Sequence, residues 1–208
     1  MDPAIQNAAL KAVLSLPRPV LRLLSGGGVV YRGGRTLDPR FQFLASHGRG
    51  LPAFSTVTPQ EARLISIQMI RMLGGPLERG VSVEMLTLPT EAGPLEARAY
   101  RPRDQDPAAP VMVFAHMGGG VIGDLDACHL FCGILAGVAR CPVLSVSYRL
   151  APEERFPAGL DDVLAAYRWA RANGSRFGAP AGAAAIGGHA IGGNFAAVIC
   201  QELRRHGE

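Results

Sequence analysis

Residues 187–194 read Gly-Gly-His-Ala-Ile-Gly-Gly-Asn, and they join a run of small residues at 183–188 to a helix-like segment at 192–205. The run at 183–188 is typical of a short strand. A chain that turns from strand to helix within so few residues needs small neighbours at the turn, and Gly188 and Gly192 supply them. The stretch therefore predicts an α/β protein in which positions 189–191 lie at the tip of a tight strand-to-helix turn.

Strand-like and helix-like segments alternate through much of the chain. The strand-like segments lie at 81–88, 95–100, 111–116, 142–150 and 183–188. The helix-like segments lie at 3–24 (interrupted at Pro17 and Pro19), 58–73, 126–139, 160–172 and 192–205. Residues 25–57 contain glycine breakers and are expected to be irregular. The alternation predicts a mostly parallel sheet with helices on both faces, preceded by a helical segment at 1–80.

Two further motifs stand between these elements. Residues 116–124 read His-Met-Gly-Gly-Gly-Val-Ile-Gly-Asp and directly follow a strand-like run. Residues 148–153 read Tyr-Arg-Leu-Ala-Pro-Glu, and Phe-Pro-Ala at 156–158 and two aspartates at 161–162 come after them. A glycine-rich loop lets backbone N–H groups approach a developing oxyanion closely.

In this order and spacing, the three motifs resemble the His-Gly-Gly-Gly loop, the Tyr-Arg-Leu-Ala-Pro-Glu segment and the nucleophile elbow of the hormone-sensitive-lipase-like esterases. These are family IV carboxylesterases of the α/β-hydrolase superfamily. The resemblance is good over residues 80–205, and residues 1–80 resemble the family's N-terminal helical cap more loosely. It implies an α/β-hydrolase fold with a cap at 1–80 and a core at 81–208.

The same resemblance implies the chemistry. The substrate is a small-molecule carboxylic ester, an acyl-enzyme forms at position 190, and no cofactor or metal is needed. The oxyanion is bound by the N–H groups of Gly118, Gly119 and Ile191. The residues expected to line the substrate pocket are His116, Met117, Gly120 and His189.

The sequence departs from the family pattern at three of these positions. Ala190 stands where the family has its nucleophilic serine, so we expect this chain not to hydrolyse esters. Ile191 replaces an alanine and adds a branched side chain beside the oxyanion hole. Met117 replaces a glycine, and it is expected to be strained if that position requires a positive φ.

The acid and base of the triad are a second departure. After position 190 the sequence offers only Glu202, His206 and Glu208. At 1.5 Å per residue, Glu202 lies roughly 18 Å along the elbow helix from position 190, too far to serve it. We therefore expect the chain to lack the family's C-terminal part, which leaves a sheet edge for a second copy or a complementing chain to cover.

Several interpretations remain open. The departures fit an altered and shortened esterase, or a pseudoenzyme that keeps the pocket for ligand binding, as plant gibberellin receptors of this family do. Less favoured is a dinucleotide-binding domain, because Gly118, Gly120 and Gly123 match its fingerprint but no acidic residue ends the next strand. Cys128, His129 and Cys132 are too few to predict a zinc site.

Composition excludes other classes. The formal charge is +4, and the arginines are spread singly, which does not favour nucleic-acid binding. No stretch approaches the roughly 20 apolar residues of a membrane span, and the N-terminus does not have the pattern of a signal peptide. Three of the four cysteines lie in apolar, element-like stretches, and buried thiols in a reducing cytoplasm are expected.

Overall fold

The computed structural model describes residues 3–48, 52–77 and 79–207. It contains two compact units, one of Met1–Thr58 with Arg71–Leu73 and one of Pro59–Ile70 with Gly74–Glu208. Helix α4 (Pro59–Leu73) therefore contributes to both units. The assignment of residues 1–80 as a cap stays a prediction.

The first unit is mainly helical. It contains α1 (Pro3–Leu14), α2 (Arg18–Leu24), a small hairpin of β1 (Tyr31–Arg32) and β2 (Arg35–Thr36), α3 (Pro39–His47) and a 3₁₀ turn at Phe54–Thr56. The break between α1 and α2 falls where the prolines predicted it. The prediction of an irregular stretch at 25–57 is wrong for α3, because the Asp38 side chain accepts a 2.8 Å hydrogen bond from the N–H of Arg40 and caps that helix.

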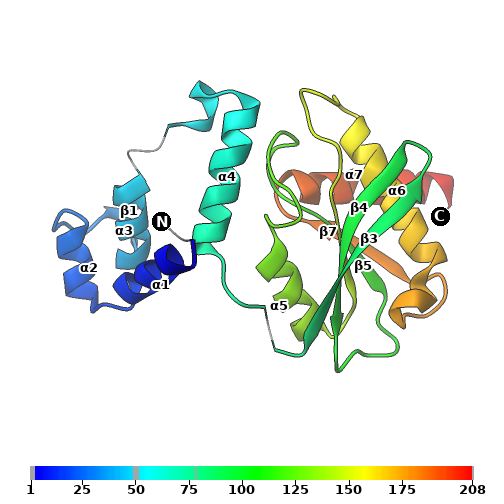
Figure 1. The fold of residues 1–208 in the computed structure, drawn as a ribbon, viewed down its shortest axis with the longest axis horizontal. Coiled ribbons are helices and arrows are strands. Elements are labelled where there is room, and N and C mark those ends of the chain that lie inside the picture. Colours follow the sequence, from blue (N-terminus) through cyan, green and yellow to red (C-terminus); the bar gives the residue numbers. More distant parts are fainter. Residues whose placement is uncertain (1–2, 49–51, 78, 208) are drawn as a thin grey trace. The chain divides into compact units, whose positions relative to one another are not determined.

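The second unit is built around a five-stranded sheet (Figure 1). Its strands in spatial order are β3 (Val81–Thr90), β4 (Gly93–Pro102), β6 (Val143–Val146), β5 (Val111–Ala115) and β7 (Ala184–Gly188). Within this sheet only β4 runs opposite to the others, because it pairs antiparallel with both neighbours while β6, β5 and β7 pair in parallel. The predicted mostly parallel sheet is therefore confirmed, with the predicted β3–β4 pair at one edge.

Helices cover both faces of this sheet. One hydrophobic cluster joins α6 (Ala158–Ala172) and α7 (Ile191–His206) to the sheet through Val163, Ala166, Phe195 and Ile199. The other joins α5 (His129–Ala139) to the opposite face through Cys132 and Ala136. Strand β5 contributes Val113 to the first cluster and its neighbour Phe114 to the second, as the alternation of side chains along a strand requires.

Strand β7 occupies an edge of the sheet within the described residues. It pairs with β5 along its whole length, and all five of its residues are only partly buried. The expected exposed edge is confirmed for this part of the chain. Among the described residues, no helix is both long and apolar enough to cross a membrane.

The cysteines are free, but they do not share one environment. Cys128, Cys132 and Cys141 are buried, as expected, whereas Cys200 is exposed on α7. Burial raises the pKa of Cys132 to about 12. The expectation of burial is therefore wrong for Cys200 alone.

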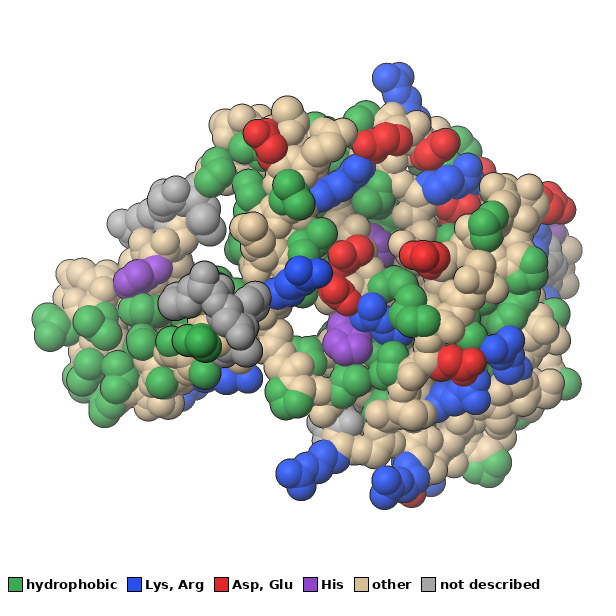
Figure 2. Space-filling view, in the orientation of Figure 1, with side chains coloured by type: hydrophobic (Ala, Val, Ile, Leu, Met, Phe, Trp, Pro, Cys, Tyr) green, Lys and Arg blue, Asp and Glu red, His purple; other side chains and the backbone are tan. Residues whose placement is uncertain are grey.

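On the visible face of the second unit, acidic and basic side chains are interspersed (Figure 2).

Candidate active site

The site lies where β5 and β7 end. Ala115 and Gly188 are paired as the last residues of these parallel strands, so His116 and His189 leave the sheet side by side. The N–H of His189 donates a 3.1 Å hydrogen bond to the carbonyl of Ala115. The topology thus brings the loop at 116–124 next to the turn at 189–191, as expected of loops that follow neighbouring parallel strands.

The turn at Ala190 is strained. Ala190 has φ 54° and ψ −116°, and among the described residues only Arg140 is another non-glycine residue with positive φ. Such a conformation costs about 1–3 kcal/mol and is found where the surrounding structure enforces it, often at functional sites. The Ala190 side chain is exposed. The strained turn thus presents position 190 to solvent.

Two glycines make the turn possible. A Cβ atom on Gly192 would lie 2.1 Å from the carbonyl oxygen of Ala115. A Cβ atom on Gly188 would lie 2.3 Å from the carbonyl carbon of Gly192. Helix α7 can therefore begin against the ends of β5 and β7 only because both side chains are missing.

The glycine loop begins with three residues of positive φ: 130° at Gly118, 65° at Gly119 and 74° at Gly120. The carbonyl of Gly118 accepts hydrogen bonds from the N–H groups of Val121 and Ile122, both at 3.0 Å. Met117 is not among the residues with positive φ. The condition for strain at Met117 is therefore not met, because the left-handed conformation starts one residue later.

Three N–H groups remain available near the turn. Within the described part of the chain, the N–H groups of Gly118 and Gly119 donate no hydrogen bond to a backbone carbonyl. The N–H of Ile191 opens helix α7, where the first N–H groups have no partner inside the helix. These are the donors that the family resemblance implies for the oxyanion, and their role stays a prediction.

His116 lies beneath the loop rather than on its surface. Its side chain is 1% exposed and stacks on the Tyr148 ring, with centroids 4.2 Å apart. Its Nδ1 donates to the carbonyl of Met117 at 2.7 Å, and the Tyr148 hydroxyl donates to the His116 carbonyl at 2.8 Å. Burial lowers the pKa of His116, so the ring is neutral at pH 7. These contacts give His116 a part in holding the loop, and its contact with substrate stays a prediction.

Arg63 of α4 connects three segments of the site. Its guanidinium donates to the Val121 carbonyl at 2.8 Å, to the Ala151 carbonyl at 2.9 Å, and to both carboxylate oxygens of Glu153 at 2.9 and 2.6 Å. The bond with Arg63 lowers the pKa of Glu153 to about 2. The N–H of Ala151 also donates to the Gly120 carbonyl at 2.8 Å. Sequence reasoning did not single out Arg63.

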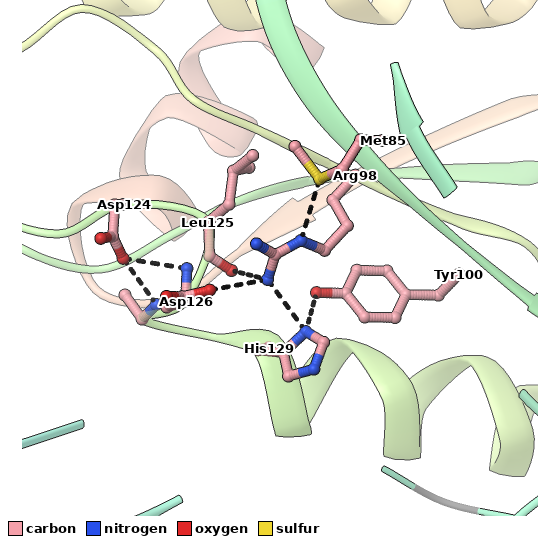
Figure 3. Close-up of polar contacts among 8 residues, drawn as sticks. Met85, Arg98, Tyr100, Asp124, Leu125, Asp126 and His129 are labelled. Atoms are coloured by element: carbon pink, nitrogen blue, oxygen red, sulfur yellow. Dashed lines mark hydrogen bonds and ion pairs between the residues drawn. The ribbon is translucent and has the colours of Figure 1, made fainter. Parts of the chain in front are cut away.

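A second arginine holds the far end of the loop (Figure 3). Arg98 of β4 donates to the Asp126 carboxylate at 2.9 Å and to the Leu125 carbonyl at 3.2 Å. The same nitrogen lies 3.0 Å from Nδ1 of His129, which also contacts the Tyr100 hydroxyl at 2.8 Å. Because a guanidinium only donates, this Nδ1 accepts and the His129 proton is on Nε2. Burial and the charge of Arg98 lower the pKa of His129.

The sequence places one acid and one histidine on the elbow helix, Glu202 and His206. These two side chains contact each other. Nε2 of His206 lies 3.0 Å from Oε1 of Glu202, at the C-terminal end of α7, whereas Ala190 precedes its N-terminal end. Among the described residues, no group of three or more His, Cys, Asp and Glu side chains is arranged to hold a metal ion.

Known proteins share this architecture. A family profile described as an alpha/beta hydrolase fold matches residues 112–208. The carboxylic ester hydrolase LipN of Mycobacterium tuberculosis is 38% identical over 206 residues, which cover 96% of this chain and 54% of that protein. The ethyl acetate hydrolase of Pseudomonas putida is 35% identical over 161 residues, which cover 76% of this chain and 50% of that protein.

Two solved structures are similar to this chain in fold. A serine-to-alanine mutant of LAE6, an α/β hydrolase from the metagenome of Lake Arreo, has a TM-score of 0.72 at 36% identity, covering 81% of this chain and 53% of that one. An ester hydrolase from the same metagenome, in complex with a bipyridine phosphonate derivative, has a TM-score of 0.73 at 33% identity, covering 93% and 56%. The first neighbour is described as an α/β hydrolase and the second as an ester hydrolase. The chain therefore has the α/β-hydrolase fold and is similar to carboxylic ester hydrolases, and it spans about half the length of the relatives it matches.

Proposed function

We propose that this chain carries the oxyanion hole and the elbow of a carboxylic ester hydrolase without the nucleophile, and that it does not hydrolyse esters on its own. The observation that supports this most strongly is the backbone of Ala190, which keeps a strained, solvent-facing turn while its methyl group offers no nucleophilic atom. Backbone strain of this kind clusters at functional sites.

The ligand is a small carboxylic ester or an analogue of it. Its carbonyl oxygen is bound by the N–H groups of Gly118, Gly119 and Ile191, and the pocket beside them includes Met117, Gly120 and His189. Fixed donors of this kind stabilise a developing oxyanion without reorganising during the reaction. In the parent activity a serine at position 190 attacks the ester carbonyl and forms an acyl-enzyme.

A ligand-binding pseudoenzyme is the second candidate. The free N–H groups of Gly118 and Gly119 support it, because binding a carbonyl or carboxylate oxygen requires these donors but no nucleophile. The dinucleotide alternative has less support. The Asp124 carboxylate accepts from the N–H groups of Asp126 and Ala127, so an acid occupies the turn where a pyrophosphate would need to bind.

The free edge of β7 supports a further proposal about assembly. An exposed edge strand presents unpaired backbone groups that favour pairing with another strand. We propose that a second copy or a complementing chain covers this edge. The four free thiols are consistent with a reducing compartment such as the cytoplasm.

An introduced thiol tests the proposed oxyanion hole without a triad. Ala190→Cys, made in a Cys200→Ser background to remove the exposed native thiol, is mixed with p-nitrophenyl acetate, and the burst of p-nitrophenol is followed. We expect acylation faster than that of a free thiol of matched pKa, because the N–H groups stabilise the oxyanion. The Cys200→Ser chain alone is the control. Acylation no faster than the free thiol would show that no oxyanion hole is formed.

A further inference from the structure

The geometry points to Arg63 as a positioning residue of the oxyanion hole, through which α4 fixes the glycine loop. This inference rests on the proposed function, because it concerns the same N–H groups. Arg63 does not touch the substrate position. It acts on Gly118 and Gly119 through the backbone that follows them.

The Arg63 guanidinium joins several segments of the site. Arg63 donates to the loop at Val121, to the adjoining segment at Ala151, and to Glu153 with two parallel bonds. An arginine fork has five N–H donors in a fixed plane, so its partners are held in fixed relative positions. A lysine in its place would be a point charge with no such plane.

The glycine loop also contacts the segment at Ala151 directly. The N–H of Ala151 donates to the Gly120 carbonyl, and the neighbouring Val121 carbonyl accepts from Arg63. Two successive carbonyl groups of the loop are therefore bound, one by Ala151 and the other by Arg63. Arg63 also binds the Ala151 carbonyl. Val121 in turn donates its N–H to the Gly118 carbonyl, so the orientation of the Gly118–Gly119 peptide depends on the position of Val121.

The glycine loop has little conformational restraint of its own. Gly118, Gly119 and Gly120 all have positive φ, and glycine populates many other conformations at little cost. Nothing in these residues themselves keeps their N–H groups turned to one point. Oxyanion stabilisation depends on donors held 2.7–3.1 Å from the developing charge, and a shift of about 1 Å can cost about a hundredfold in rate.

The connection does not depend on the strength of the Arg63–Glu153 ion pair. Arg63 is 25% exposed and Glu153 48% exposed at the side chain, so water screens the pair and its energy is small. The two carbonyl bonds do not depend on that charge. The function of Glu153 is therefore to orient the guanidinium, and the function of the guanidinium is to hold Val121.

The test compares two reactions of one thiol. In the Ala190→Cys, Cys200→Ser background, acylation by p-nitrophenyl acetate passes through an oxyanion, whereas alkylation by iodoacetamide does not. We expect Arg63→Ala to lower the acylation rate about tenfold to a hundredfold and to leave the alkylation rate unchanged. Arg63→Lys should fail to rescue acylation, and Glu153→Gln should lower it less than Arg63→Ala, because the carbonyl bonds remain.

Arg71→Ala is the matched control, since it removes an exposed arginine from the last turn of the same helix. Equal acylation rates with Arg63 and with alanine at that position would overturn the inference while leaving the oxyanion hole intact. Equal losses of acylation and alkylation would also overturn it, because they would reveal a general loss of structure. If acylation is not accelerated even with Arg63 present, the proposed function itself fails.

Discussion

A methyl group on Gly192 would lie 2.1 Å from the carbonyl oxygen of Ala115, so α7 starts in direct contact with the end of β5. This contact brings the first N–H groups of α7 to the same edge of the sheet as the glycine loop. The position of the elbow is thus determined by packing against β5 as well as by the local turn at Ala190.

Replacing Gly192 with alanine should therefore disrupt the elbow. The added methyl group would overlap backbone atoms, which cannot move as a flexible side chain can, and overpacking of this kind costs about 1–3 kcal/mol or more. Urea unfolding would measure the loss. Gly48→Ala is the control, because a Cβ atom there meets nothing within 4 Å. Equal stability of the two variants would contradict the close packing of α7 on β5.

Tyr148→Phe tests the support beneath the loop. The change removes the hydrogen bond to the His116 carbonyl but keeps the ring stacked on His116. We expect a loss of about 1–3 kcal/mol in the free energy of unfolding, because a buried carbonyl loses its partner. Calorimetric melting compared with Tyr31→Phe, at an exposed tyrosine, measures it. No difference between them would mean that this hydrogen bond does not stabilise the fold.

The buried histidines predict a pH dependence. The pKa of His116 is lowered in the folded chain, so below about pH 6.5 the unfolded chain binds a proton that the folded chain does not. Stability is then complete above pH 6.5 and falls on acidification, by at most about 1.4 kcal/mol per pH unit for this group. His129, which is more exposed, should add a smaller effect of the same sign.

Urea unfolding between pH 7.5 and pH 5.5 checks this, with His116→Asn as the informative variant. That variant should show a flatter pH dependence than the unmodified chain, because it lacks the buried imidazole. A slope unchanged by His116→Asn would show that His116 is not the titrating group.

Local sequence was enough to predict the parts of the site that depend on backbone freedom. The glycines at 188 and 192 predicted a tight turn, and the structure shows why no larger residue fits there. The strand pair β3–β4 and the parallel strands were likewise predicted from local patterns. The capping signal of α3, Asp38 followed by Pro39, was present in the sequence but was outweighed by the neighbouring glycines.

Long-range contacts could not be predicted in this way. Arg63 reaches groups that are 58, 88 and 90 residues further along the chain, and no periodicity connects them. The strain expected at Met117 depended on which loop residue first adopts positive φ, and that is decided by the hydrogen bonds of the folded loop. The same is true of the Arg98–His129 contact in Figure 3, which joins β4 to α5.

The exposed edge of β7 predicts self-association. Several unpaired backbone groups at one edge favour pairing with a second strand, and each costs about 1–3 kcal/mol if it is buried without a partner. Light scattering after size exclusion, at low micromolar concentration, should find dimers or larger species. A strictly monomeric chain that unfolds cooperatively, with a melting temperature independent of concentration, would contradict this prediction.

We propose that position 190 retains the geometry of a nucleophile elbow without its chemistry. The most direct test is the hydrolysis of p-nitrophenyl acetate by the unmodified chain, in a preparation cleared of host esterases. We predict no turnover above a buffer blank, because Ala190 has no atom that can attack the ester. The contradicting result is saturable turnover well above the blank that persists when Cys200 is replaced by serine. It would show that this chain hydrolyses esters without a nucleophile at position 190.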